Sequence, residues 1–111
     1  MEKTIDILCA GEILIDCIGQ QNNATLAETT SYARFLGGSP TNVAINASKL
    51  GLRSALVASC GADGLGDFMI ESLQKANVIT TQLSQKQDTS TSIILVSKST
   101  GTPDFIPYRT A

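Results

Sequence analysis

The sequence predicts an α/β fold with a parallel sheet, because two apolar strands alternate with two amphipathic helices. Residues 5–11 and 55–60 are short, nearly continuous apolar runs, a pattern typical of strands buried on both faces of a parallel sheet. A helical pattern follows each run, one at about 40–50 and one from a cap at Asp63 to about Asn77. Two strand–helix units in succession favour right-handed crossovers with flanking helices.

The first helix has start and stop signals in its sequence. Ser39 is a good N-cap, Pro40 suits the first helical position, and Gly51 stands where a left-handed C-terminal residue is favoured. Its apolar positions at helical spacing are Val43, Ala44, Ala47 and Leu50. Because that face is largely alanine, we expect the helix to approach the sheet closely.

The second helix follows the glycine-rich turn at 61–64. Asp63 is expected to cap it, and Asp67 is interpreted as a first-turn acid rather than as half of a metal pair. The apolar positions of this helix are Leu65, Met69, Leu73 and Ala76. The order of glycines at 61–66 reverses the dinucleotide fingerprint, and no Walker loop occurs in the sequence.

The remaining segments predict an accessory sheet beside the α/β body. They are an extended stretch at 13–18, a loop at 19–28, a polar stretch at 80–92, a strand at 93–96, a turn at 99–102 and an extended stretch at 105–108. The last strand, turn and extended stretch have the pattern of a hairpin. We therefore expect a flap or small lid sheet attached to the parallel body.

Composition excludes several classes of function. The 111 residues allow one domain, and with a net charge of −2 and no cluster of basic residues the chain has no surface suited to nucleic acid. Neither a signal peptide nor a membrane span is indicated. The three cysteines suggest no disulfide framework, so we expect a cytoplasmic protein with Cys9 and Cys60 buried. Because the sequence contains no histidine, it excludes histidine-assisted catalysis by a serine or cysteine nucleophile and the commonest sets of zinc ligands.

The segment 37–44 is the candidate binding loop. Gly37 and Gly38 allow the backbone to approach a ligand, and the following helix would present its N-terminal N–H groups to sugar hydroxyls or to an anion. The alternative is a purely structural glycine turn before a helix.

The same segment resembles the N-terminal signature of the pfkB family of carbohydrate kinases. The residues in register with the signature are Gly37, Gly38, Pro40, Asn42, Ala44, Gly51 and Gly61, and Gly64, Gly66 and Asp67 continue it loosely. The resemblance extends over essentially the whole chain. It implies the N-terminal part of a ribokinase-like three-layer fold, with core elements at about 4–12 and 37–80 and lid elements at about 13–36 and 90–109.

The resemblance also implies a sugar site. Asp16 would accept hydrogen bonds from two sugar hydroxyls, Asn42 would bind another, and the backbone of Gly37 and Gly38 would line the sugar. In the fructokinase and 2-keto-3-deoxygluconate kinase branches an arginine after the flap strand reaches the substrate, and Arg109 resembles it. The alternatives are a solvated carboxylate at a strand end, an asparagine bonded within its own helical turn and a surface arginine.

The family's catalytic aspartate, anion hole and nucleotide pocket belong to a downstream G-A-G-D region, and this sequence contains no such motif. The resemblance therefore implies the sugar-binding part of an ATP-dependent kinase for a fructose-like sugar or a keto-deoxy sugar acid. ATP and Mg²⁺ would bind mainly in the missing C-terminal part, and the fragment alone would be inactive. The lid strands would allow a homodimer. The alternative is a free-standing sugar-binding or assembly module without catalysis.

Overall fold

The computed structural model of the protein describes residues 5–99, 101 and 104–109. Within them the elements run in the order β1 (Ile7–Ala10), β2 (Leu14–Gly19), β3 (Tyr32–Gly37), α1 (Ser39–Lys49), β4 (Ser54–Gly61), α2 (Gly64–Lys75), β5 (Leu83–Lys86), β6 (Ile93–Val96) and β7 (Phe105–Tyr108). The α/β class predicted from the sequence is confirmed. The predicted turn at 99–102 falls partly outside the described residues.

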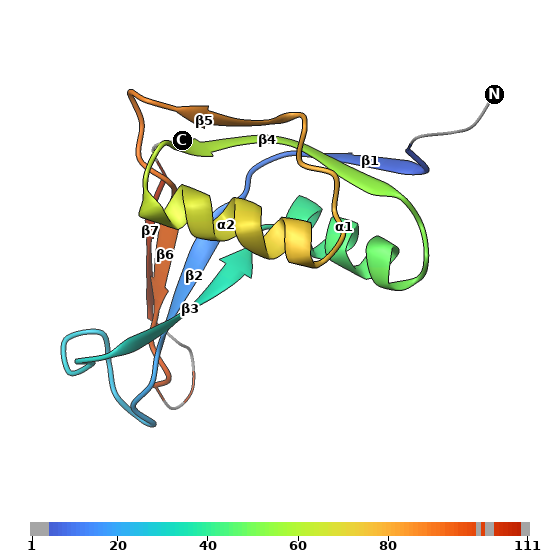
Figure 1. Cartoon of the computed structure of the whole chain (residues 1–111). Helices are drawn as coiled ribbons and strands as arrows, with labels where there is room; N and C mark the ends of the chain where they lie inside the picture. The colour runs from blue at the N-terminus through green and yellow to red at the C-terminus, as the bar shows by residue number, and fades with distance from the viewer. Residues whose placement is uncertain (1–4, 100, 102–103, 110–111) are drawn as a thin grey trace.

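The body of the protein is a three-stranded parallel sheet in the order β1-β4-β5, which we call the body sheet. Helices α1 and α2 lie against one of its faces (Figure 1). The core between them contains Cys9, Leu56 and Cys60 from the strands and Met69 and Leu73 from α2. Both cysteines predicted to be buried are confirmed, at 8 and 0 % exposure.

The described residues bury strand β1 on one face only, whereas its sequence predicted burial on both faces. The side chain of Leu8 is 57 % exposed, and Val57 of the neighbouring strand is 37 % exposed on the same side. Apolar continuity predicted helices on both faces. In the described part of the chain, however, α1 and α2 both cover the other face, the one that buries Cys9 and Leu56.

Helix α1 begins one residue earlier than expected, and Ser39 is not its N-cap. Gly38 holds the N-cap position, Ser39 is the first helical residue, and no side chain caps this end of the helix. The end was predicted correctly, since Gly51 has a φ of +90° directly after the C-cap.

The buried face of α1 is narrower than the periodicity suggested. Ala44 and Ala47 are buried together with Thr41, whereas Val43 and Leu50 are 49 and 83 % exposed. Val43 and Leu50 stand seven residues apart and share a stripe that turns away from the sheet. The small residues that do face the sheet permit the close approach that was predicted.

Helix α2 follows its sequence signals closely. The Asp63 carboxylate accepts a hydrogen bond from the N–H of Gly66 at 2.8 Å and caps the helix. Met69 and Leu73 are fully buried, and Asn77 has the left-handed φ of +63° after the last turn. No helix in the described ranges is long and apolar enough to cross a membrane.

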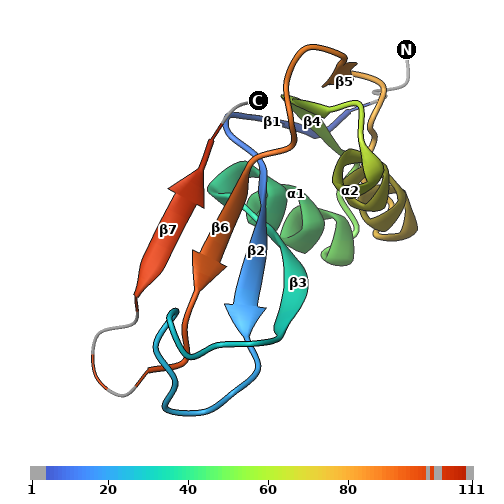
Figure 2. The same ribbon diagram turned by 90° about the vertical axis from the view of Figure 1, so that its left-hand side faces the viewer.

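The second sheet has four strands in the order β3-β2-β6-β7, and we call it the lid sheet (Figure 2). Strand β2 pairs antiparallel with β3 and parallel with β6, and β6 pairs antiparallel with β7 as the hairpin pattern predicted. Strands β3 and β5 were not foreseen as strands. Ile15 of β2 is fully buried and joins the core of the body, so the two sheets share one hydrophobic core.

A hydrogen-bond cluster joins the turn before α2 to the start of β6. The Asp63 carboxylate accepts bonds from the N–H of Thr91 at 2.8 Å and from its hydroxyl at 2.7 Å. The same hydroxyl accepts a bond from the N–H of Gly61 at 3.0 Å. Asp63 therefore caps a body helix and also anchors the base of the lid sheet.

Candidate functional site

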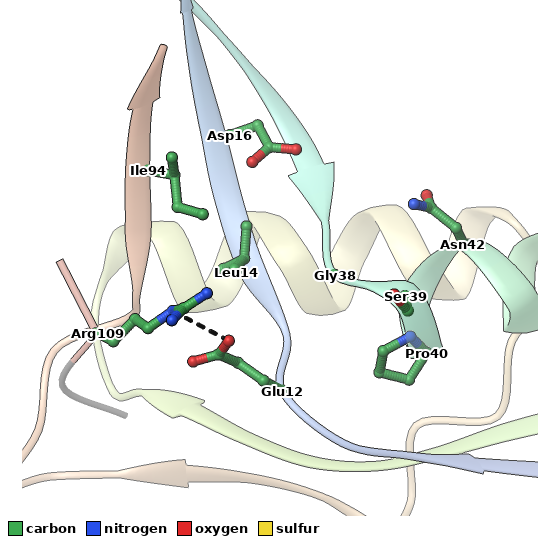
Figure 3. Close-up of a pocket in the computed structure, with 9 residues that line it drawn as sticks. All are labelled: Glu12, Leu14, Asp16, Gly38, Ser39, Pro40, Asn42, Ile94 and Arg109. Carbon is green, nitrogen blue, oxygen red and sulfur yellow. Dashed lines mark ion pairs between the residues drawn. The ribbon is translucent and has the colours of Figure 1, made fainter. Parts of the chain in front are cut away.

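A pocket lies where the two sheets meet, at the carboxyl end of β1 and the N-terminal end of α1 (Figure 3). Its volume is about 460 Å³, and small-molecule sites typically have volumes of roughly 300 to 1,000 Å³. Crevices beyond the carboxyl ends of parallel strands are the usual ligand sites of α/β proteins. The lining residues are Glu12, Leu14, Asp16, Gly38, Ser39, Pro40, Asn42, Ile94 and Arg109.

A smaller hollow of about 310 Å³ lies at the other end of the body, between the last turn of α1 and the start of β4. It is lined by Ser48, Gly51, Leu52, Arg53, Asn77 and Ile79. None of the predicted site residues lies there, and no carboxylate faces it among these residues. The pocket between the sheets is therefore the candidate site.

Gly38 brings the start of α1 against the strand that leaves the body sheet. Its φ of +96° is one that residues with a side chain rarely adopt. A Cβ at this position would also lie 2.5 Å from the carbonyl oxygen of Glu12, closer than any real contact. The glycine thus sets the distance between the N-terminus of α1 and Glu12, which form two walls of the pocket.

Asp16 projects from the middle of β2 on the face of the lid sheet that borders the pocket. Its register partners on this face are Phe35 of β3 and Ile94 of β6. Gly37 leaves room for it, because a Cβ there would lie 2.6 Å from the Asp16 carboxylate oxygen Oδ2. The carboxylate stands in a largely apolar wall.

The Asp16 carboxylate has no hydrogen-bond partner among the described residues. Partial burial raises the pKa of Asp16 above the ordinary aspartate value, because desolvation penalises the charged form. An unpartnered carboxylate in a half-buried position is poorly solvated and can accept hydrogen bonds from a ligand.

Asn42 faces the pocket from the first turn of α1, on the far side of Gly38 from Asp16 (Figure 3). Its backbone N–H bonds to the carbonyl of Gly38 at 3.2 Å, whereas its side-chain amide has no bond to any described residue. The alternative that Asn42 bonds within its own turn therefore receives no support. The exposed amide can donate and accept hydrogen bonds at the uncapped, positive end of the helix.

Arg109 follows β7 and reaches back to the start of β2. Its Nε lies 3.2 Å from Oε1 of Glu12 (Figure 3). Glu12 was not predicted as a site residue. One signal was available, since Glu12 directly follows Gly11 at the carboxyl end of the first strand, where α/β ligand sites lie.

The structure gathers four of the five predicted site residues around one pocket: Asp16, Gly38, Asn42 and Arg109. Gly37 does not line it and lies beneath Asp16 instead. These residues come from β2, the loop before α1, α1 itself and the end of β7, so the grouping depends on the meeting of the two sheets. Their roles toward a sugar stay predictions.

The described residues include no group of three or more histidine, cysteine or acidic side chains placed to hold a metal ion. The first turn of α1 is not a triphosphate loop, because the sequence has no Walker pattern. We therefore assign none of the pocket's residues to ATP or Mg²⁺.

Solved structures and curated proteins that are similar to this chain include several named as sugar kinases. The Halothermothrix orenii fructokinase structure superposes with a TM-score of 0.90 at 41 % identity, over 96 % of this chain and 38 % of that protein. An ATP-dependent 6-phosphofructokinase of Thermoanaerobacterium thermosaccharolyticum is 41 % identical over 99 % of this chain and 34 % of its own length. A 5-dehydro-2-deoxygluconokinase of Bacillus subtilis is 36 % identical over 78 % of this chain and 27 % of its length.

The chain spans about a third of the length of these relatives. The pfkB carbohydrate kinase family nevertheless matches it from residue 4 to residue 111, which is almost its whole length. This match includes the glycine pair, Asn42 and the strands that build the pocket. The chain belongs to the pfkB family of carbohydrate kinases.

Proposed function

We propose that the protein carrying this chain is an ATP-dependent carbohydrate kinase and that the pocket between the body sheet and the lid sheet is part of its sugar site. The observation that carries the proposal is the unpartnered Asp16 carboxylate, which faces the pocket opposite the free Asn42 amide. A sugar presents adjacent hydroxyls, which can donate to a carboxylate and accept from an amide. We further place the protein in the cytoplasm.

In this proposal the residues of the chain bind and orient the sugar. Asp16 accepts bonds from two hydroxyls, and Asn42 and the N-terminal end of α1 hold a third. Ile94 and Leu14 provide an apolar wall that excludes water from one side of the sugar. ATP supplies the phosphoryl group when it is bound, and positioning of the acceptor hydroxyl is a large part of phosphoryl transfer.

The names of the relatives do not agree on one sugar. They include a fructokinase, a 6-phosphofructokinase and 5-dehydro-2-deoxygluconokinases. We propose a fructose-like sugar or a keto-deoxy sugar acid as the substrate class. A second candidate function is a sugar-binding module without catalysis, because the described residues provide a binding pocket but no assigned catalytic base. Continuation of the reading frame into a G-A-G-D motif would decide for the kinase.

Residues 1–111 by themselves should show no ATP-dependent phosphorylation of any sugar, whereas the protein at full length should phosphorylate at least one. The sequence lacks the G-A-G-D motif that carries the family's catalytic aspartate, and transfer needs a base and an anion-stabilising site as well as a sugar site. A coupled assay of ADP formation over a panel of hexoses and sugar acids measures both proteins.

Turnover by the 111-residue chain above a no-protein control would contradict this prediction. An inactive full-length protein that still binds a sugar would favour the binding module. Circular dichroism of the short chain serves as the folding control.

We also propose that the lid sheet mediates a homodimer. Phe35 and Phe105 lie on the face of the lid sheet that carries Asp16, and they are 50 and 65 % exposed. Strand β7 is an edge strand that contains Pro107, which lacks a ladder N–H, so association through the apolar face is favoured over edge pairing.

Phe105→Glu should shift the full-length protein from dimer to monomer in sedimentation velocity. The matched control is Ile106→Glu, because Ile106 is 43 % exposed on the opposite face of the same strand. A monomeric wild type at high concentration, or equal association of the two variants, would contradict the dimer.

A further inference from the structure

The ion pair between Glu12 and Arg109 closes one side of the pocket. It joins the segment after β1 to the end of β7, with Oε1 and Nε 3.2 Å apart. Both residues line the pocket, and their side chains remain 42 and 56 % exposed. The Arg109 guanidinium that lines the pocket is thus already engaged by a carboxylate of the same chain.

The charges that this chain contributes to the lining of the pocket sum to a negative value. The lining contains two carboxylates, of Glu12 and Asp16, and one guanidinium, of Arg109, which gives a formal charge of −1. The uncapped N-terminus of α1 adds roughly half a positive charge. This partial charge is too small to reverse the sign, so the residues of this chain exert a net repulsion on an anionic ligand.

We infer that the pocket takes an uncharged polyhydroxy sugar in preference to a sugar acid or sugar phosphate, and that Glu12 sets this preference by engaging Arg109. The inference rests on the proposed function and names its substrate class. A neutral sugar can donate hydroxyls to both carboxylates and accept from the guanidinium while the ion pair stays in place. An anion instead has to compete with Glu12 for Arg109 in the presence of Asp16.

The size of the preference follows from the exposure of the pair. A half-exposed ion pair is weakly held, so an anion can displace Glu12 at a modest cost. Removing one unit charge a few ångströms from the ligand in such a site changes affinity on the order of tenfold. Glu12 is therefore a specificity-determining residue whose charge can be removed without changing its size.

The test compares D-fructose with D-gluconate on the full-length protein, because these probes are similar in size and differ in charge. Isothermal titration calorimetry gives the ratio of their dissociation constants for wild type and for Glu12→Gln. Wild type should bind fructose more tightly. The Glu12→Gln variant should shift the ratio toward gluconate by about tenfold.

Two further variants show whether the effect acts through Arg109. The double variant Glu12→Gln with Arg109→Gln should lose the shift, because the released guanidinium is gone. Glu71→Gln is the matched control, since Glu71 is an exposed residue of α2 and does not line the pocket. It should leave the ratio at the wild-type value.

A wild type that prefers gluconate, an unchanged ratio in Glu12→Gln, or failure to bind either probe would overturn the inference. Binding with the expected ratios but without ATP-dependent phosphorylation of any sugar would count against the proposed kinase and leave the charge preference supported. The binding ratios therefore test the charge preference of the pocket, and phosphorylation separately tests the proposed kinase function.

Discussion

Replacing Asp16 with asparagine in the full-length protein should lower kcat/KM for the preferred sugar by about 10- to 100-fold. The carboxylate lies unpartnered beside the pocket and is expected to accept bonds from two hydroxyls. Charge-assisted bonds contribute roughly 1.5 to 3 kcal/mol each, and tenfold in affinity corresponds to about 1.4 kcal/mol. Asparagine keeps the size but replaces one acceptor oxygen with a donor. Because the hydroxyls are bound before and during transfer, KM should rise.

The same substitution should leave the melting temperature unchanged or slightly raise it. Burial raises the pKa of Asp16, which means that folding disfavours its ionised form. The stability that this group contributes is therefore fully present below the pKa of the unfolded chain. It is lost as the pH rises through the raised pKa of the folded protein. An uncharged asparagine avoids this cost at neutral pH.

Sugar binding should have the opposite pH dependence, since only the ionised carboxylate accepts two hydroxyls. Affinity should fall as the pH decreases through the raised pKa of Asp16, at a higher pH than for an ordinary aspartate. Asp88→Asn, in an exposed turn after β5, is the matched control for steady-state kinetics and thermal melts. An unchanged kcat/KM in Asp16→Asn would remove Asp16 from the site, and a large loss of melting temperature would show a structural role.

Asp63→Ala should lower the free energy of unfolding by about 2 to 4 kcal/mol. It removes an N-cap, which is typically worth about 1 kcal/mol, and hydrogen bonds to a charged acceptor, worth roughly 1.5 to 3 kcal/mol. It also frees the base of β6, because the bonds to Thr91 join the lid sheet to the turn before α2. Urea denaturation of wild type and variant at neutral pH measures the difference.

The Asp63 contribution should disappear in acid. Burial alone would raise the pKa of Asp63, but hydrogen bonds from Thr91, Gly66 and Leu65 outweigh burial and hold it below the ordinary value. A lowered carboxylate pKa stabilises the fold above the pKa of the unfolded chain, and this stability is lost as the pH falls through the folded-state pKa. The stability difference between wild type and Asp63→Ala should therefore shrink through that acidic range.

Thr91→Val provides a graded comparison, because it removes the hydroxyl's bonds to Asp63 and to the N–H of Gly61 but keeps the backbone bond to Asp63. It should lose less stability than Asp63→Ala. Asp88→Ala should lose almost none. Equal stability of wild type and Asp63→Ala, or a difference independent of pH, would contradict the role assigned to this carboxylate.

Elements whose signals are local were predicted well from the sequence. Helix α2 has its cap, its buried positions and its left-handed end within one continuous segment, so nothing distant was needed to place it. Strand β5, by contrast, is a polar run of Leu, Ser, Gln and Lys whose side chains are mostly exposed. It is a strand because it pairs with β4, and β3 likewise depends on β2. Pairing of this kind leaves little trace in the strand's own sequence.

The residues of the candidate site likewise include some that the sequence predicted and one that it did not. Gly38 and Asn42 were found through the signature around the glycine pair, and Asp16 through its resemblance to the family's aspartate after the first strand. The structure brings all three to one pocket. Glu12 belongs to no such motif. Its proposed role depends on its ion pair with Arg109, which is almost a hundred residues away in the sequence and could not be foreseen from the residues around Glu12. Exposure of Leu8 was missed for a related reason, since apolar character does not say which layer covers a strand.

The chain passes between the body sheet and the lid sheet at three places: residues 11–13, Gly38 and residues 87–92. Two of these crossings contribute Glu12 and Gly38 to the pocket, and the third carries Thr91, which is bonded to Asp63. Any rotation of one sheet against the other must be absorbed by the backbone torsions of these same crossings. The angle between the sheets and the width of the pocket therefore change together. A ligand that spans Asp16 and Asn42 would hold the two sheets at one angle and restrict the motion of all three crossings.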